Sequence, residues 1–116
     1  MLTSIYEAIF GFLSQLPYPF YLADSVPQGA ALPYITMQIE APLSPGESGT
    51  LTLTAWSTSN AQRLSIVNML LPARGKWLAT TTGALTITPD GPTRPVQDGP
   101  LLGMQRRWKL HFYPSV

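Results

Sequence analysis

The sequence predicts an α+β domain with a mostly antiparallel sheet of four to five strands and two helices packed on one face. Three observations predict this class. Two segments repeat apolar residues at helical spacing, and several shorter segments alternate apolar and polar residues. The two clearest of these strands each have one polar face, as expected of an antiparallel sheet whose other face is covered by helices. The predicted order is α-β-β-β-α-β-β, in a single domain spanning residues 1–116.

The first predicted helix covers about residues 3–16. Thr3 or Ser4 can cap its N-terminus, and Pro17 stops it. The apolar residues that define its buried face recur every three or four positions, namely Leu2, Ile5, Ile9, Leu13 and Leu16. Residues 19–22 follow as a short edge strand, because proline is tolerated at a sheet edge and not in its centre.

A connector without ionisable side chains follows at residues 26–33. Gly29 permits a turn with positive φ. The connector's prolines, Pro27 and Pro33, fix their own φ at about −65°. Pro33 favours an extended Leu32, so the next strand starts already oriented. Such a segment is poorly suited to catalysis and well suited to contact with another protein, and Gln28 is its candidate interface residue.

Residues 34–41 and 50–57 are the clearest strands. Their alternation predicts an inward set and an outward set of mostly threonine and glutamine. The inward set is Ile35, Met37, Ile39, Ala41, Leu51, Leu53 and Ala55. Strict alternation places Trp56 on the threonine face, where it could anchor a partner protein. Alternatively, the strand ends there and the ring packs under the start of the second helix.

Ser59 and Gln62 fit a capping box that begins a second helix, which Pro72 ends near residue 71. Residues 84–88 and 106–113 are then predicted as strands. Between them, residues 89–100 contain four prolines and two glycines, and we expect a long loop. Arg94 is its natural anchor for an acidic neighbour and Val96 a second interface candidate. The alternative is a plain connection with no role.

Charged residues make up only 11% of the chain, against about 25% in typical domains. A charge-poor surface suggests that part of it is covered by further copies of the chain, although threonine, serine and glutamine could also keep a monomer soluble. Residues 1–62 carry a formal charge of −4 and residues 63–116 carry +5. Opposite poles could steer head-to-tail contacts, unless folding interleaves the two halves.

Residues with catalytic or metal-binding chemistry are sparse. The chain has one histidine, His111, and no cysteine, and its six carboxylates are scattered. We therefore expect no enzyme, cofactor or metal site. The apolar run at residues 8–13 is too short to span a bilayer, so no membrane partner is expected.

The sharpest charge signal is a candidate basic face of Arg106, Arg107 and Lys109. Basic residues beside an aromatic ring can hold a nucleic-acid backbone and stack a base. Trp108, however, shares parity with the apolar Leu110, so it is expected to face the core. The alternative to nucleic-acid binding is that these residues simply form a solvated basic face.

Four features in this order resemble the tail-terminator, or tail-completion, proteins of long-tailed bacteriophages. They are the short N-terminal helix, the Val-Pro-Gln-Gly connector at 26–29, the Pro-Tyr start of the strand at 33–34, and the threonine/leucine strand at 51–57 that ends in Trp-Ser before a helix. The resemblance covers residues 1 to about 71, and the proline-rich segment 89–100 does not match it.

This resemblance implies a structural virion protein without catalytic activity. It implies a ring, typically a hexamer, that caps the tail tube, ends tube polymerisation and provides the docking surface for the head. The implied partners are further copies of itself, the tail tube protein and a head-completion or connector protein. Double-stranded DNA would pass through the lumen without specific binding, with the basic face lining that channel or meeting a neighbour. Its location would be the head-proximal end of the tail, after assembly in the host cytoplasm. The alternatives are a head-completion or connector protein of the same virion neck, and a small nucleic-acid-binding module.

Overall fold

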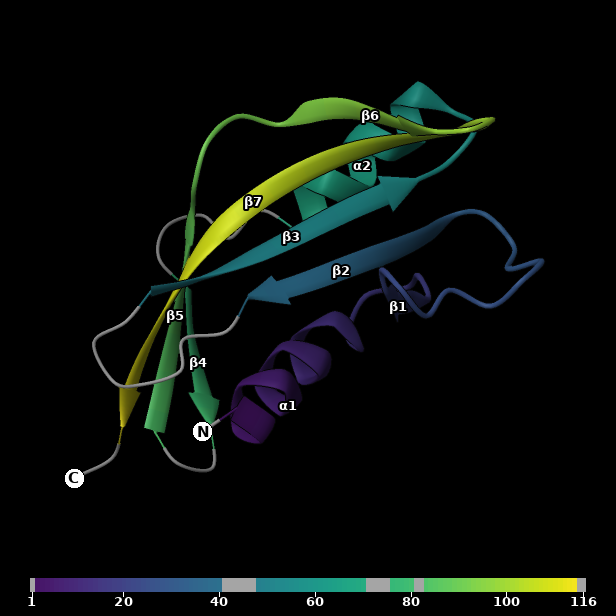
Figure 1. Cartoon of the computed structure of the whole chain (residues 1–116). Helices are drawn as coiled ribbons and strands as arrows, with labels where there is room; N and C mark the ends of the chain where they lie inside the picture. Colours follow the sequence, from purple (N-terminus) through teal and green to yellow (C-terminus); the bar gives the residue numbers. More distant parts are fainter. Residues whose placement is uncertain (1, 41–47, 71–75, 81–82, 115–116) are drawn as a thin grey trace.

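The computed structural model of the chain describes residues 2–40, 48–70, 76–80 and 83–114 (Figure 1). The described residues form two helices and a mixed sheet, which confirms the α+β class. In chain order the elements are α1 (Leu2–Leu13), β1 (Phe20–Leu22), β2 (Tyr34–Glu40), β3 (Ser48–Trp56), α2 (Asn60–Leu70), β4 (Lys76–Thr80), β5 (Gly83–Pro89), β6 (Arg94–Asp98) and β7 (Leu101–Pro114).

The sheet has seven strands within the described residues, more than the four to five expected. Its order is β1-β2-β3-β7-β5-β4, and β6 pairs with β7 off this path. All pairings are antiparallel except that of β1 with β2, which is parallel. β1 is an edge strand, as the proline before it predicts.

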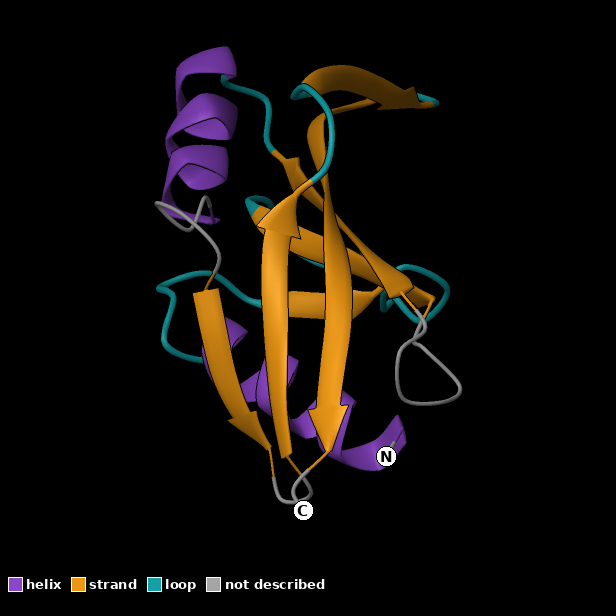
Figure 2. Ribbon diagram, turned by 90° about the vertical axis from the view of Figure 1, so that its left-hand side faces the viewer, coloured by secondary structure: helices purple, strands orange, loops and turns teal. Residues whose placement is uncertain are grey.

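The long strand β7 organises the sheet (Figure 2). One side of it pairs with β3 from Gly103 to His111. Its other side pairs first with β6, through Gln105, and then with β5, from Trp108 onward. The same edge of β7 therefore passes from one partner strand to the next and leaves a short break in pairing between them.

The register places the predicted inward residues of β2 and β3 on one face of the sheet, except Ala41, which lies outside the described residues. Leu53 lies opposite Met37, and Leu51 lies opposite Trp108. These side chains join both helices in one buried cluster: Ile9, Leu13, Ile35, Met37, Leu51, Leu53, Ala55, Ile66, Val67, Leu85, Ile87, Trp108, Leu110 and Phe112. The opposite side, which carries Thr36, Thr52 and Thr54, is called the threonine face below.

Two strands were not expected from the sequence. β6 lies within the segment 89–100, so the expectation of a long loop is wrong: this segment contains an edge strand that forms a hairpin with β7. Pro95 is compatible with an edge strand, because the backbone groups on the outer side of such a strand need no partner strand. β4 pairs with β5 and forms the other edge of the main path.

Some local signals around the helices are confirmed. α1 ends at Leu13, before the expected end at residue 16, and the expected stop of the second helix at Pro72 lies outside the described residues. Gly29 has a φ of 77°, as its turn requires. Ser59 caps α2, since its hydroxyl accepts a bond from the Gln62 backbone N–H at 3.3 Å. The Gln62 side chain does not reach back to Ser59 but accepts a bond from the Ser57 hydroxyl. No helix among the described residues is both long and apolar enough to cross a membrane.

Candidate functional site

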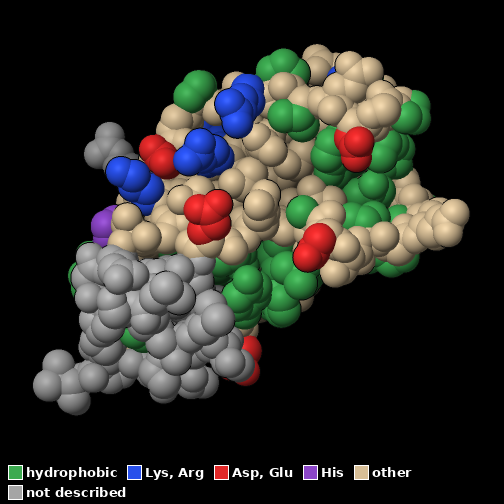
Figure 3. Space-filling model, in the orientation of Figure 1, with side chains coloured by type: hydrophobic (Ala, Val, Ile, Leu, Met, Phe, Trp, Pro, Cys, Tyr) green, Lys and Arg blue, Asp and Glu red, His purple; other side chains and the backbone are tan. Residues whose placement is uncertain are grey.

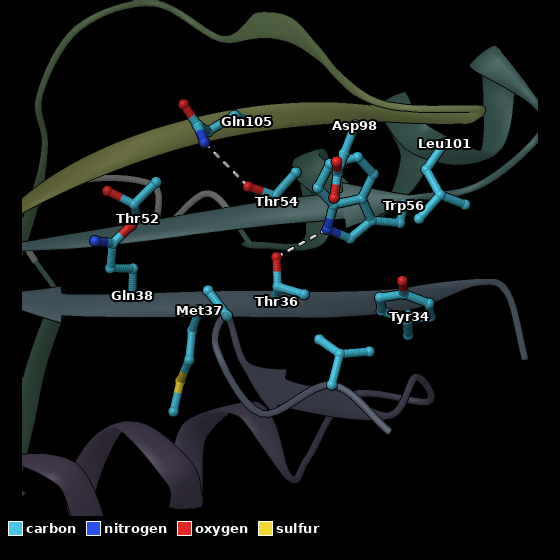
Figure 4. A pocket seen from close by; sticks show the side chains of 12 residues that line it. Tyr34, Thr36, Met37, Gln38, Thr52, Thr54, Trp56, Asp98, Leu101 and Gln105 are labelled. Atoms are coloured by element: carbon cyan, nitrogen blue, oxygen red, sulfur yellow. Dashed lines mark hydrogen bonds between the residues drawn. The ribbon is translucent and has the colours of Figure 1, made fainter. Parts of the chain in front are cut away.

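A depression of about 440 Å³ lies on the threonine face, where β2, β3 and β7 run side by side (Figure 4). Its floor is polar and neutral, and its rim comes from the connector after β1 and from the β6–β7 turn. The lining residues are Ala23, Val26, Tyr34, Thr36, Met37, Gln38, Thr52, Thr54, Trp56, Asp98, Leu101 and Gln105. Asp98 is the one carboxylate among them, so the depression offers hydrogen bonds and aromatic surface more than charge.

Trp56 is the central aromatic residue of this depression. It lies at the end of β3 on the threonine face, as alternation predicts, and is half-buried. Its indole Nε1–H donates a hydrogen bond to Thr36 Oγ1 at 2.8 Å (Figure 4). The alternative, in which the ring packs under the second helix, is therefore wrong.

Gly103 of β7 makes room for this ring. A Cβ atom built at Gly103 would lie 2.8 Å from Trp56 Cε3 and 2.9 Å from Thr54 Cγ2, closer than real Cβ contacts. The absence of a side chain there lets the indole approach the neighbouring strand closely. Thr36 and Thr54 are buried as a result, although both belong to the polar face.

A chain of side-chain hydrogen bonds leads from the depression toward the basic residues. Gln105 Nε2 donates to Thr54 Oγ1 at 3.2 Å. Arg94 in turn donates to Gln105 Oε1 through Nη2 at 3.3 Å and Nε at 3.4 Å. Gln105 thus connects the Trp56 depression to the guanidinium group on β6.

The candidate basic face divides between the two sides of the sheet. Arg107 and Lys109 are exposed and share parity on β7, on the threonine face. Arg106 lies opposite the buried Leu53, is half-buried, and donates from Nη1 to Thr93 Oγ1 at 3.0 Å. Figure 3 shows Lys and Arg side chains gathered on the threonine face with acidic side chains among them.

The remaining interface candidates do not form one patch. Gln28 is exposed on the connector and does not line the depression. Val96 is half-buried and Arg94 exposed, both on β6. The two oppositely charged halves of the sequence interleave here, because Glu40 lines one hollow together with Arg94 and Arg107.

Gln105 and Asp98 line the depression although no local sequence pattern marks them as site residues. Both belong to the β6–β7 hairpin, and neither can be placed without recognising that hairpin. Within the described residues, no group of three or more His, Cys, Asp or Glu side chains could hold a metal ion. No protein-family model and no curated protein sequence matches the chain.

Replacing Trp56 by phenylalanine should remove the bond to Thr36 while keeping an aromatic ring. We expect a loss of about 1 kcal/mol in the free energy of unfolding, typical of one intramolecular hydrogen bond. Urea denaturation of Trp56→Phe, Thr36→Val and the double variant measures the coupling. Fully additive losses would show that the bond contributes nothing.

Proposed function

We propose that the protein is a structural virion protein that caps a phage tail tube as a homo-oligomeric ring, ends tube polymerisation and provides the docking surface for the head. The observation that carries the proposal is the convergence of the segments that resemble tail terminators. Val26 of the connector, Tyr34 at the start of β2 and Trp56 at the end of β3 all line one exposed depression. Segments distant in the sequence therefore build a single surface.

The chemistry of this surface suits a protein partner. Trp56 is half-buried and Trp is enriched where partners bind, whereas Tyr34 is 6% exposed and offers little contact area. Gln38, Thr52 and Gln105 are not buried, and they supply donors and acceptors around Trp56 without a charge that must be desolvated. The charge-poor composition favours further copies of the chain as partners. The proposed docking role adds the tail tube protein and the neck proteins as partners.

Electron microscopy of a phage lacking this protein tests the assignment. Overlong tubes would support a terminator, because tube growth would lack its stop. Tubes of normal length that fail to join heads would instead indicate the related head-completion role. Normal tails joined to heads would contradict both, and supplying the wild-type protein in trans should restore normal virions.

A point variant tests the docking surface itself. Val26→Asp places a charge on the rim of the depression without touching the core, and we expect joined virions to fall about tenfold or more. Ala31→Asp is the matched control, since Ala31 is exposed on the same connector and does not line the depression. Equal complementation by both variants would exclude this depression as the contact.

A further inference from the structure

The outer edge of β2 is covered by β1 along only part of its length. β1 pairs with β2 opposite Ile35 to Met37, and the chain then turns away, while β2 continues to Glu40 (Figure 1). Among the described residues, no other strand pairs with β2 on this side. The end of β2 is therefore an open sheet edge.

Two backbone hydrogen bonds identify the residues of β2 whose backbone groups point toward this edge. The Ile35 N–H donates to the Pro19 carbonyl at 2.9 Å. The Ala23 N–H donates to the Met37 carbonyl, also at 2.9 Å. Backbone groups of successive strand residues point to opposite edges, so Ile39 is the next residue of this set. Its N–H and C=O lie beyond the end of β1, and such unpaired edge groups are a template for pairing with another chain.

A hollow of about 360 Å³ lies beside this open edge. The residues that line it come from α1, from the end of β1 and from β2: Tyr6, Leu22, Ala23, Asp24, Met37, Gln38 and Ile39. The Tyr6 ring makes an edge-to-face contact with Phe10, and Phe10 contacts Phe20 of β1, with ring centroids 5.8 Å apart in both pairs. The hollow therefore combines a fixed aromatic wall with an unpaired backbone, as a site for an extended peptide requires.

Asp24 makes the hollow negative. It is exposed, and it is the only Asp, Glu, Lys or Arg among the lining residues that the structure describes. Its Oδ1 accepts a bond from the Ser25 hydroxyl at 3.3 Å, and within the described part of the chain no ion pair neutralises it. A cationic side chain of a partner would complement this charge. A second copy of the same edge would not, because it would bring two Asp24 carboxylates together.

We infer that this edge binds an extended segment of a partner protein that carries a lysine or an arginine. The segment continues the line of β1 alongside β2 and exchanges backbone hydrogen bonds with Ile39. One of its apolar side chains fills the hollow between Tyr6 and Leu22, and its cation pairs with Asp24. The hollow adjoins the Trp56 depression, but this inference goes beyond the proposed virion role and does not depend on it.

Amide hydrogen exchange of the purified full-length protein, followed by NMR, tests whether the edge is open. The Ile39 amide should exchange at least about tenfold faster than the Ile35 amide, because only the Ile35 N–H is bonded toward β1. Equal protection of the two amides would overturn the inference.

A peptide of sequence Val-Lys-Val-Lys-Val, blocked at both ends, is the probe for the partner segment. It should bind saturably, shift the Ile39 resonance and slow the exchange of that amide. The matching peptide Val-Glu-Val-Glu-Val should bind at least about tenfold more weakly, because its charge repels Asp24. Failure of the lysine peptide to bind saturably, or equal binding of the two peptides, would contradict the proposal.

Two substitutions at Ile39 separate backbone pairing from side-chain packing. Ile39→Pro removes the N–H on the open edge, whereas Ile39→Ala keeps it, and both shorten the side chain. The lost N–H does not face β3, so both variants should keep the circular-dichroism spectrum of the wild type. Binding of the lysine peptide should be lost in Ile39→Pro and retained in Ile39→Ala. Equal binding by the two folded variants would exclude backbone pairing at this edge.

A second pair of variants tests the cation site without changing the sheet. Asp24→Asn should weaken binding of the lysine peptide about threefold or more. Glu7→Gln is the control, because Glu7 is exposed on α1 and does not line the hollow. Equal weakening by both would show diffuse attraction and no assigned contact. If sedimentation showed self-association that Ile39→Pro alone abolished, the occupant would be a second copy and the assignment to a partner protein would be wrong.

Discussion

Replacing Leu53 by alanine is expected to lower the free energy of unfolding by about 2–5 kcal/mol. Leu53 lies in the middle of β3, is 1% exposed, and packs in the cluster shared by both helices. The substitution removes apolar contacts and leaves a cavity that its neighbours on both adjoining strands cannot fill without moving. Such a loss is a large fraction of the stability of a domain this size. Urea denaturation monitored by circular dichroism measures it.

Thr52→Ala is the matched control for this prediction. Thr52 is the preceding residue on the same strand, is half-exposed, and lines the depression on the threonine face. Its truncation should cost less than about 1 kcal/mol. If both variants had equal urea midpoints, the register of β3 would be reversed. Ile35→Ala and Leu51→Ala should lower the free energy of unfolding by a similar amount to Leu53→Ala. The sequence predicts the same loss for Ile39→Ala, but Ile39 is only partly buried, so its truncation should cost less.

Introducing a methyl group at Gly103 is expected to cost about 1–3 kcal/mol, the usual effect of overpacking. The new Cβ would overlap both the Trp56 ring and the Thr54 methyl group, so the indole must move away from Thr36. Urea denaturation gives the loss of stability. Gly103→Ala combined with Trp56→Val should recover part of it, because the smaller side chain frees the space.

Gly11→Ala provides the opposite case. Gly11 lies in α1, and a Cβ there would meet nothing within 4 Å. Alanine should therefore stabilise the helix by about 0.5–1 kcal/mol. A stability loss at Gly103 no greater than the change at Gly11 would show that the close approach of Trp56 to β7 is not a constraint on the fold.

The strands β2 and β3 could be predicted because their alternation is regular and one face is buried. β6 could not, because Arg94–Asp98 has no buried apolar set: four of its five residues are exposed, and it pairs with β7 through backbone bonds and the exposed Arg94–Gln105 side-chain bonds. Backbone pairing leaves little trace in the side-chain pattern. The start of β7 was missed for a related reason, since Gly103 interrupts the apolar spacing at the point where it accommodates Trp56.

The candidate site was predictable to the same extent. The position of Trp56 follows from parity alone. Arg106 and Arg107 are neighbours in a strand, so alternation already separates them onto opposite faces, and grouping them as one basic face ignored that rule. Gln105 links two parts of the site only because residues 94–98 fold back beside it, a long-range arrangement that no local pattern encodes.

The central position of β7 also has a consequence for the order of folding. β3 pairs with β7 across a long stretch of intervening chain, Ser48 with His111 and Trp56 with Gly103. Such non-local pairings are slow to form, because a large loop must close before any contact rewards it. Because β2 and β3 precede β7 in the chain, both leave the ribosome before β7 emerges. Until then one edge of β3 stays open to pairing with another nascent chain, so the period between translation of Trp56 and that of Pro114 is when this protein is most exposed to misassembly.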